Sequence, residues 1–299
     1  MNNFLRDKII IPARVMIKDD FNAKKFYFIP GILSIVFLTV ILVYQSIYTY
    51  VNIIGYNKDK ILKTILGFLE SDYGIKFIIA GIIFLIIYFF LTPIFEAGLI
   101  KYVDIKYKGG NISKSEAFGQ GLYKFLQTFE YNNIFSEFKI LSILNGYLFV
   151  IRFTGVEYIK VVSYVFLCLL FFGIIINILF SYSKFFIILE NQSVFQAIGE
   201  STKLAILNPK TTVKLFFLIF ILNLRVIINF IVFLIFPIIV VSAITYISVK
   251  FLLLVTIIIA TVGFVGFVFF MGYLTAVLDV FKTSLWYHAY VYGKKVSER

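Results

Sequence analysis

Four long apolar blocks dominate the chain and carry almost no charge. Residues 28–54, 161–180 and 251–278 contain no charged side chain, and residues 77–99 contain only Glu96. A helix needs about 20 consecutive apolar residues to cross the hydrocarbon core of a bilayer. We therefore predict that each of these four blocks is a transmembrane helix.

Two further apolar segments are interrupted by charge. Residues 134–153 hold Glu137, Lys139 and Arg152 near their ends, and residues 212–247 contain Arg225. Counting each as one span predicts an all-α fold, a polytopic transmembrane helical bundle of about six helices, with the bounds of the third and fifth spans left open. The composition agrees, because 61% of the residues are hydrophobic and 15% are charged, against about 45–50% and about 25% in soluble domains.

The basic residues predict the orientation of these spans. With six spans, most of the 28 Lys and Arg residues lie on the side that holds both termini and the loops after the second and fourth spans. Basic residues accumulate on the cytoplasmic side of a membrane. We therefore expect residues 1–27 to be a cytoplasmic amphipathic segment, residues 28–281 a domain in the cell membrane, and residues 282–299 a basic cytoplasmic tail. The first block is too long for a signal peptide, whose apolar core has about 7–15 residues, so it is interpreted as a retained anchor.

A short motif, N-x-S-x-x-x-A-x-G, occurs at residues 111–119 and again at residues 191–199. The distance along the chain between the two motif copies also separates the second span from the fourth and the third from the fifth. This agreement predicts that the chain is built from repeated hairpins of spans. Each copy continues with helical periodicity, and Ser113 and Ser193 are suitable N-caps. We expect two amphipathic helices on the cytoplasmic interface, with lysines that contact lipid phosphates: Lys114, Lys124 and Lys203. Residues 4–17 have a related character and suggest a third unit.

The second copy carries a family resemblance. The segment from Glu190-Asn191-Gln192-Ser193 through Ala197-Ile198-Gly199-Glu200-Ser201 to Asn208 resembles the glycerophosphodiester phosphodiesterase membrane-domain family and related six-helix bacterial and archaeal membrane proteins. The resemblance implies a six-helix membrane domain. In those phosphodiesterases hydrolysis resides in a separate soluble barrel, and this chain has no soluble block of that size. The resemblance therefore does not carry over an activity.

No pattern typical of catalysis is present. His288 is the only histidine and Cys168 the only cysteine, and the chain has no CxxC or HExxH motif. We therefore expect no catalytic residue, cofactor or metal. The net charge of +12 does not indicate nucleic-acid binding, because the aromatic residues lie inside apolar blocks. It indicates attraction to anionic head groups. The favoured function is a non-enzymatic role in membrane organisation or sensing, or as an accessory protein of the cell envelope, with a homo-oligomer or an envelope protein as further partner.

Arg225 is the one basic residue expected away from the ends of a span, where charge is costly and faces a partner or a wet cavity. A candidate polar cavity would combine it with asparagines of three spans: Asn223, Asn229, Asn145 and Asn177. This cavity would support the alternative function, a small-molecule or lipid transporter. If the true span begins at Val226, Arg225 instead extends to the interface. The sequence leaves both readings open.

Three structural expectations concern smaller features. Small residues in the sixth span predict close helix packing: Gly263, Gly266, Gly272 and Ala276. An interfacial aromatic belt is predicted near the C-terminus: Trp286, Tyr287, Tyr290 and Tyr292. Cys168 is expected to be a small buried side chain, and Glu96 to pair with a nearby lysine.

Overall fold

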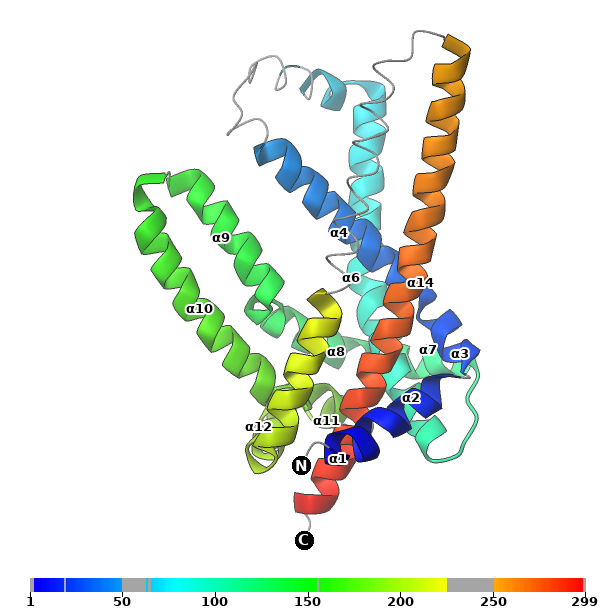
Figure 1. Ribbon diagram of the computed structural model, residues 1–299, viewed down its shortest axis with the longest axis vertical. Helices are drawn as coiled ribbons and strands as arrows, with labels where there is room; N and C mark the ends of the chain where they lie inside the picture. Colours follow the sequence, from blue (N-terminus) through cyan, green and yellow to red (C-terminus); the bar gives the residue numbers. More distant parts are fainter. Residues whose placement is uncertain are drawn as a thin grey trace. The chain divides into compact units, whose positions relative to one another are not determined.

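The computed structural model describes residues 3–18, 20–49, 63, 66–154, 156–224 and 250–297. These residues are almost entirely helical and form no strand. They divide into two compact units, of which the first comprises Met1–Ala23, Pro93–Leu224 and Val280–Arg299, and the second Lys24–Thr92 and Arg225–Asp279. Figure 1 shows the helices coloured along the chain. Two long helices contribute residues to both units: α6 (Asp72–Tyr107) and α14 (Lys250–Ser297).

In the second unit, α4 (Phe28–Thr49) packs closely against α14. A Cβ atom added to Gly31 would lie 2.3 Å from the carbonyl oxygen of Gly272, so the backbones meet where neither helix has a side chain. Ile35 and Met271 form a small core beside this contact. Gly272 therefore serves the close packing expected of it, whereas Gly263 and Gly266 have open space around them.

The first unit assembles the end of α6, the end of α14 and the N-terminal helices with most of the middle of the chain. The N-terminal helices are α1 (Asn3–Leu5), a π-helical turn (Arg6–Ile10), α2 (Ile11–Lys18) and α3 (Phe21–Phe26), the last of which runs into the second unit. The middle helices are α7 (Lys114–Tyr123), α8 (Phe125–Phe135), α9 (Ile140–Thr154), α10 (Ile159–Leu179), α11 (Ser183–Leu189) and α12 (Val194–Leu207). Leu99 of α6, Ile187 of α11 and Leu285 of α14 are fully buried in this unit.

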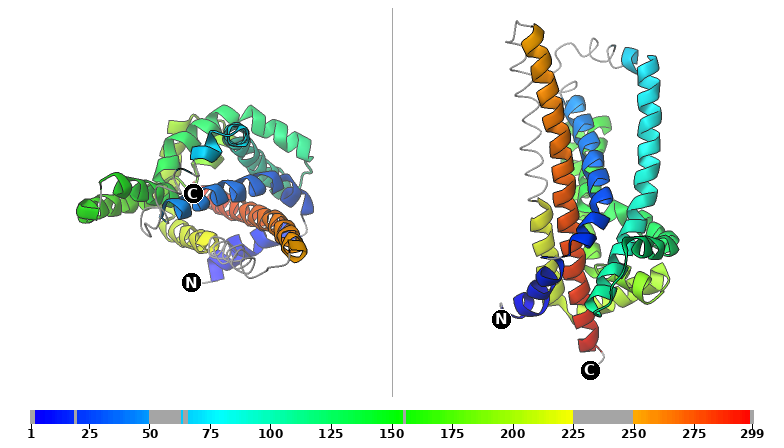
Figure 2. Two further views of the ribbon diagram at one scale, coloured as in Figure 1. Left: turned by 90° about the horizontal axis from the view of Figure 1, so that it is seen from above. Right: turned by 90° about the vertical axis from the view of Figure 1, so that its right-hand side faces the viewer.

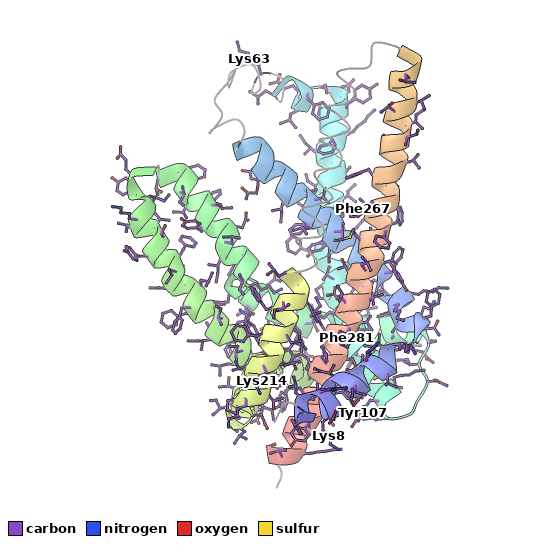
Figure 3. All side chains as sticks on the ribbon, in the orientation of Figure 1. Lys8, Lys63, Tyr107, Lys214, Phe267 and Phe281 are labelled. Carbon is purple, nitrogen blue, oxygen red and sulfur yellow. The ribbon has the colours of Figure 1, made fainter. Side chains whose placement is uncertain are left out.

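Helices α9 and α10 form a hairpin that stays side by side in Figures 1 and 2. Asn177 of α10 holds the hairpin closed, because its Nδ2 donates to the carbonyl oxygen of Phe138 at 2.7 Å. Gly173 lies one turn earlier, where an added Cβ atom would meet the same carbonyl at 2.9 Å. Beyond this point apolar side chains project outward along the pair (Figure 3), and Phe153 and Tyr164 are about three-quarters exposed.

Both copies of the sequence motif begin a helix at the serine expected to cap it. Ser113 accepts the backbone N–H of Glu116 at 3.2 Å, and the Glu116 side chain accepts the backbone N–H of Ser113 at 2.8 Å. Ser193 and Gln196 form the corresponding capping box before α12. The reciprocal bonds satisfy backbone donors that a helix start leaves open, which explains why α7 and α12 begin where they do.

The described residues contain three helices long and apolar enough to cross a membrane, at Asp72–Tyr107, Ile159–Leu189 and Thr261–Ser297. A fourth arises if α12 and the following helix, Pro209–Leu224, count as one span, although they meet at 104°. The first expected span contains a shorter apolar helix, Phe28–Ile41. The described residues are thus all-helical and hold three to four candidate membrane spans, and the expected number of six stays a prediction, since most of the fifth expected span lies outside them.

Several expected segments are shaped differently from the prediction. Residues 134–153 are not one helix, because α8 ends at Phe135, a 3-10 turn covers Ser136–Phe138, and α9 begins at Ile140. At about 1.5 Å per residue, the 15 residues of α9 fall short of a bilayer core of about 30 Å. Residues 225–247 of the expected fifth span lie outside the described residues. Residues 282–297, expected as a tail, continue α14, and Cys168 is exposed rather than buried.

Candidate functional site

A charged cluster in the first unit is centred on Glu96, which lies on α6 three residues after Pro93. Its carboxylate forms an ion pair with Lys184 of α11 and accepts a hydrogen bond from Asn132 Nδ2 of α8 at 3.1 Å. The side chains of Glu96 and Lys184 are 24% and 22% exposed. Partly covered charges interact more strongly than exposed ones, because less water screens them. The pair therefore ties α6 to α11.

Tyr131 of α8 covers one side of this ion pair. The ammonium nitrogen of Lys184 lies 5.5 Å from the centre of the Tyr131 ring, within reach of a cation–π interaction. The Tyr131 hydroxyl donates to the carbonyl oxygen of Phe180 at 3.1 Å. Burial raises the pKa of Tyr131 above its usual range, and the negative charge of Glu96 acts in the same direction. The phenol therefore stays neutral at physiological pH.

Lys139, in the connection between the 3-10 turn and α9, adds a second cation. It interacts electrostatically with both Glu96 and Lys184. No carboxylate of the described residues forms an ion pair with it. We call the set of Glu96, Asn132, Tyr131, Lys139 and Lys184 the Glu96 cluster. It holds two ammonium groups for one carboxylate.

A second polar pattern joins helices of the same unit. Asp20 accepts the Tyr102 hydroxyl at 2.8 and 2.9 Å, and Lys106, one turn further along α6, lies 4.0 Å away. Glu190 likewise takes the Tyr290 hydroxyl and, at 2.7 Å, the ammonium group of Lys294. Each carboxylate is thus held by a tyrosine and a lysine four residues apart on one helix. We call these two arrangements the tyrosine–lysine clamps.

A related contact links α6 to α14. Asp104 accepts the Tyr287 hydroxyl at 2.8 Å and pairs with Lys108 at 2.9 Å. Tyr287 and Tyr290 are 1% and 5% exposed, so the expected aromatic belt is wrong for both. Their polar ends find carboxylate partners inside the unit instead of water at an interface.

The structure distributes the asparagines of the expected polar cavity among different partners. Arg225 and Asn229 lie outside the described residues. Asn223 accepts a hydrogen bond from Lys282 at 2.7 Å, and Asn177 serves the α9–α10 hairpin. Asn145 is exposed on α9. Asn223 and Asn177 thus have different partners, and the expected cavity with Arg225 stays a prediction.

The three lysines expected at lipid phosphates differ in exposure. Lys114 is exposed at the first turn of α7, and the side chain of Lys203 is 72% exposed, with an ion pair to Glu200 at 2.9 Å. Lys124 is only 7% exposed and donates to Gln127 at 3.1 Å. Burial, followed by the charge of Lys101, lowers the pKa of Lys124. Lys114 and Lys203 are therefore the two that can reach a head group directly.

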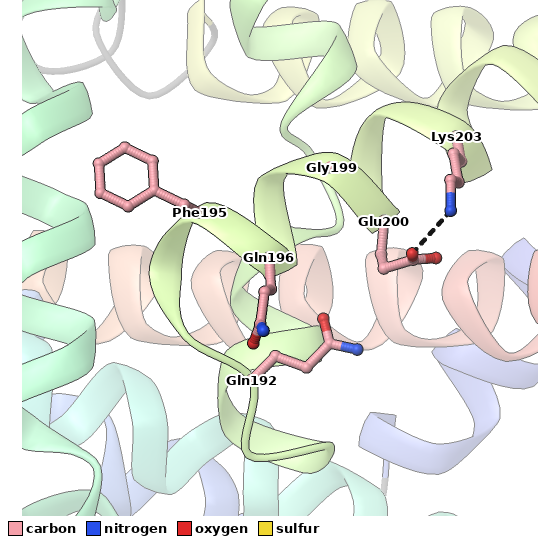
Figure 4. Close-up of a pocket in the computed structure, with 6 residues that line it drawn as sticks. All are labelled: Gln192, Phe195, Gln196, Gly199, Glu200 and Lys203. Atoms are coloured by element: carbon pink, nitrogen blue, oxygen red, sulfur yellow. Dashed lines mark hydrogen bonds and ion pairs between the residues drawn. The ribbon is translucent and has the colours of Figure 1, made fainter.

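A surface hollow of about 500 Å³ lies over α12 (Figure 4). The residues that line it come from α12 and the residue before its cap: Gln192, Phe195, Gln196, Gly199, Glu200 and Lys203. It is open to solvent on one side and does not enclose a substrate-sized chamber. Across the described ranges, no group of three or more His, Cys, Asp or Glu side chains could hold a metal ion.

Sequence reasoning predicted a lysine partner for Glu96, but it missed that the partner is Lys184 and missed the rest of the Glu96 cluster, because the members are far apart along the chain. Glu96 and Lys184 are separated by 88 residues, and neither belongs to a recognisable motif. The only available signal was a lone carboxylate in an apolar block, which requires a partner. Comparison with protein-family models, curated proteins and solved structures finds no match for the chain. Its function must therefore be argued from its own residues.

Proposed function

We propose that this protein is a non-enzymatic, multi-pass protein of the cell membrane that organises or senses the membrane by binding anionic head groups through α7 and α12. The observation that carries this proposal is the two-sided character of both helices. Ala117 and Ala197 are fully buried, as is Ser201, whereas Leu122 and Phe195 are 56% and 72% exposed. Such helices can insert an apolar face beneath the head groups.

Charge supports the same role. Lys114 and Lys203 stand exposed beside these apolar side chains, and each basic residue near an anionic leaflet contributes about 1 kcal/mol of attraction. The excess of basic residues near both termini favours a cytoplasmic location for them, and α7 and α12 would then meet the cytoplasmic leaflet. The resemblance to the phosphodiesterase membrane domains supports a membrane role and carries over no activity.

The test is amide hydrogen exchange of residues 114–123 and 194–207 in nanodiscs. In nanodiscs with phosphatidylglycerol, both segments should exchange more slowly than in phosphatidylcholine alone, because the head groups shield them. The double variant Lys114→Gln/Lys203→Gln should lose most of that difference. Lys160→Gln removes an exposed lysine from α10 and should behave like the wild type.

Exchange that is independent of lipid charge in the wild type would refute the proposal. The orientation is tested separately with reporter fusions after Arg299 and between Lys101 and Lys108, both of which should report a cytoplasmic location. Transport through a cavity around Arg225 stays the alternative proposal, because Arg225 and Asn229 lie outside the described residues.

A further inference from the structure

The Glu96 cluster is unbalanced in charge. Glu96 is bound by Lys184 and Asn132, while Lys139 adds a second positive charge that repels Lys184. Like charges in a partly covered site are unfavourable unless a counter-ion lies between or beside them. A group with negative oxygen atoms would remove this repulsion.

Asn132 offers a second, independent indication. Its Nδ2 donates to Glu96, which fixes the amide, because the opposite orientation would turn its oxygen toward a carboxylate that only accepts. The amide oxygen, Oδ1, is buried and has no hydrogen-bond partner among the described residues. A buried acceptor without a donor is costly. The site therefore lacks an O–H or N–H group at this position.

The donors of the Glu96 cluster suit an oxyanion. Lys184 is held by the Glu96 carboxylate and by the Tyr131 ring. Lys139 is exposed, so its ammonium group is open to a ligand from solvent. Two ammonium groups that act on one place suit a tetrahedral anion with several acceptor oxygens.

We infer that the Glu96 cluster binds a phosphate group that carries or adjoins a hydroxyl. Lys139 and Lys184 donate to its negative oxygens, and its hydroxyl donates to Asn132 Oδ1. This chemistry is shared by inorganic phosphate and by a hydroxylated phospholipid head group such as phosphatidylglycerol. The site uses neither Lys114 nor Lys203, so it stands or falls separately from the lipid contacts of α7 and α12.

The experiment measures the melting temperature of the full chain in phosphatidylcholine nanodiscs. One arm adds inorganic phosphate, with sodium chloride at equal ionic strength as reference, and the other replaces part of the lipid by phosphatidylglycerol. We expect saturable stabilisation in at least one arm. Lys139→Gln should lower the affinity for the ligand, read from the concentration that gives half of the full stabilisation, by about tenfold or more. This is the loss typical of one hydrogen bond between charged groups.

Three comparisons make the result specific. Lys139→Arg keeps the charge and should retain the response, Lys160→Gln should match the wild type, and circular dichroism checks that each variant is folded. A response to phosphate alone identifies a soluble ligand, and a response to phosphatidylglycerol alone identifies a lipid, provided that Lys139→Gln weakens the response as expected.

Several results would overturn the inference. These are no response in either arm, an equal response to sodium chloride, and a Lys139→Gln variant that responds like the wild type. If phosphatidylglycerol stabilises Lys139→Gln fully but not the Lys114→Gln/Lys203→Gln variant, the lipid acts only through α7 and α12. In that case the proposed function survives and the Glu96 cluster is a structural ion pair.

Discussion

Replacing Gly121 by alanine should loosen the contact between α7 and α6. A Cβ atom at Gly121 would lie 2.0 Å from the carbonyl oxygen of Ile94 and 3.0 Å from the backbone nitrogen of Gly98. Both obstacles are backbone atoms, so no side chain can rotate away. The helices would have to separate by about 1 Å or more before the nearest contact reached 3.0 Å. Overpacking of this kind costs about 1–3 kcal/mol.

Gly119, two residues earlier on α7, provides the matched control. Nothing lies within 4 Å of a Cβ atom added there, so Gly119→Ala should stabilise α7 by about 0.5–1 kcal/mol through the unfolded chain. The gain in helix propensity is common to both variants and cancels in their comparison. The difference between the two free energies of unfolding should therefore equal the packing cost, about 1–3 kcal/mol.

The assay is unfolding of the detergent-solubilised protein followed by tryptophan fluorescence. Trp286 is the only tryptophan, and its ring lies 5.4 Å from that of Tyr182 inside the first unit, so its emission reports on the unit that contains α7. Equal shifts for Gly119→Ala and Gly121→Ala would show that α7 does not pack on α6 at Gly121, and the reasoning would fail.

Three further outcomes follow from hydrogen bonds of the first unit. Ser201→Ala should lower the free energy of unfolding by about 1–3 kcal/mol, because the Ser201 hydroxyl accepts from the backbone N–H of Tyr182 at 3.0 Å and donates to the Leu179 carbonyl at 2.7 Å. Calorimetry should show this loss as a lower melting temperature. Ser113→Ala should speed amide exchange in the first turn of α7, with a loss of about 0.5–2 kcal/mol in the stability of that turn. A backbone hydrogen bond from Ser113 holds the pKa of Glu116 below its usual value. The stability that the ionised Glu116 adds is therefore complete above that usual value and is lost as pH falls through the lower pKa of the folded state. Circular dichroism from roughly pH 6 to roughly pH 3 should show this loss in the wild type and not in Glu116→Gln.

Local features of the fold could be predicted from the sequence. Ser113 and Ser193 each begin a helix, because a serine cap and an acidic or amide residue three positions later form a self-contained unit. The apolar blocks likewise mark α4, α6, α10 and α14. These predictions depend on neighbours within a few residues, which a single sequence displays directly.

Burial and long-range partners could not be predicted in the same way. In an apolar helix the side chains that face other helices and those that face outward are both hydrophobic, so Cys168 gave no sign of its exposure. The break at Ser136–Phe138 divides a segment that hydropathy presents as continuous. Lys184 and Glu96 meet only because α11 folds back on α6.

The hydrogen bonds that two tyrosines of α14 donate to Glu190 and Asp104 also set an order on biosynthesis. Glu190 leaves the ribosome 100 residues before Tyr290, and Asp104 leaves it 183 residues before Tyr287. Until the last segment of α14 has been made, both carboxylates lack the tyrosine that they bind in the finished protein. The first unit therefore completes its packing only after translation has reached the C-terminal helix, and a nascent chain stalled before Val280 would be a natural client for chaperones and quality-control proteases.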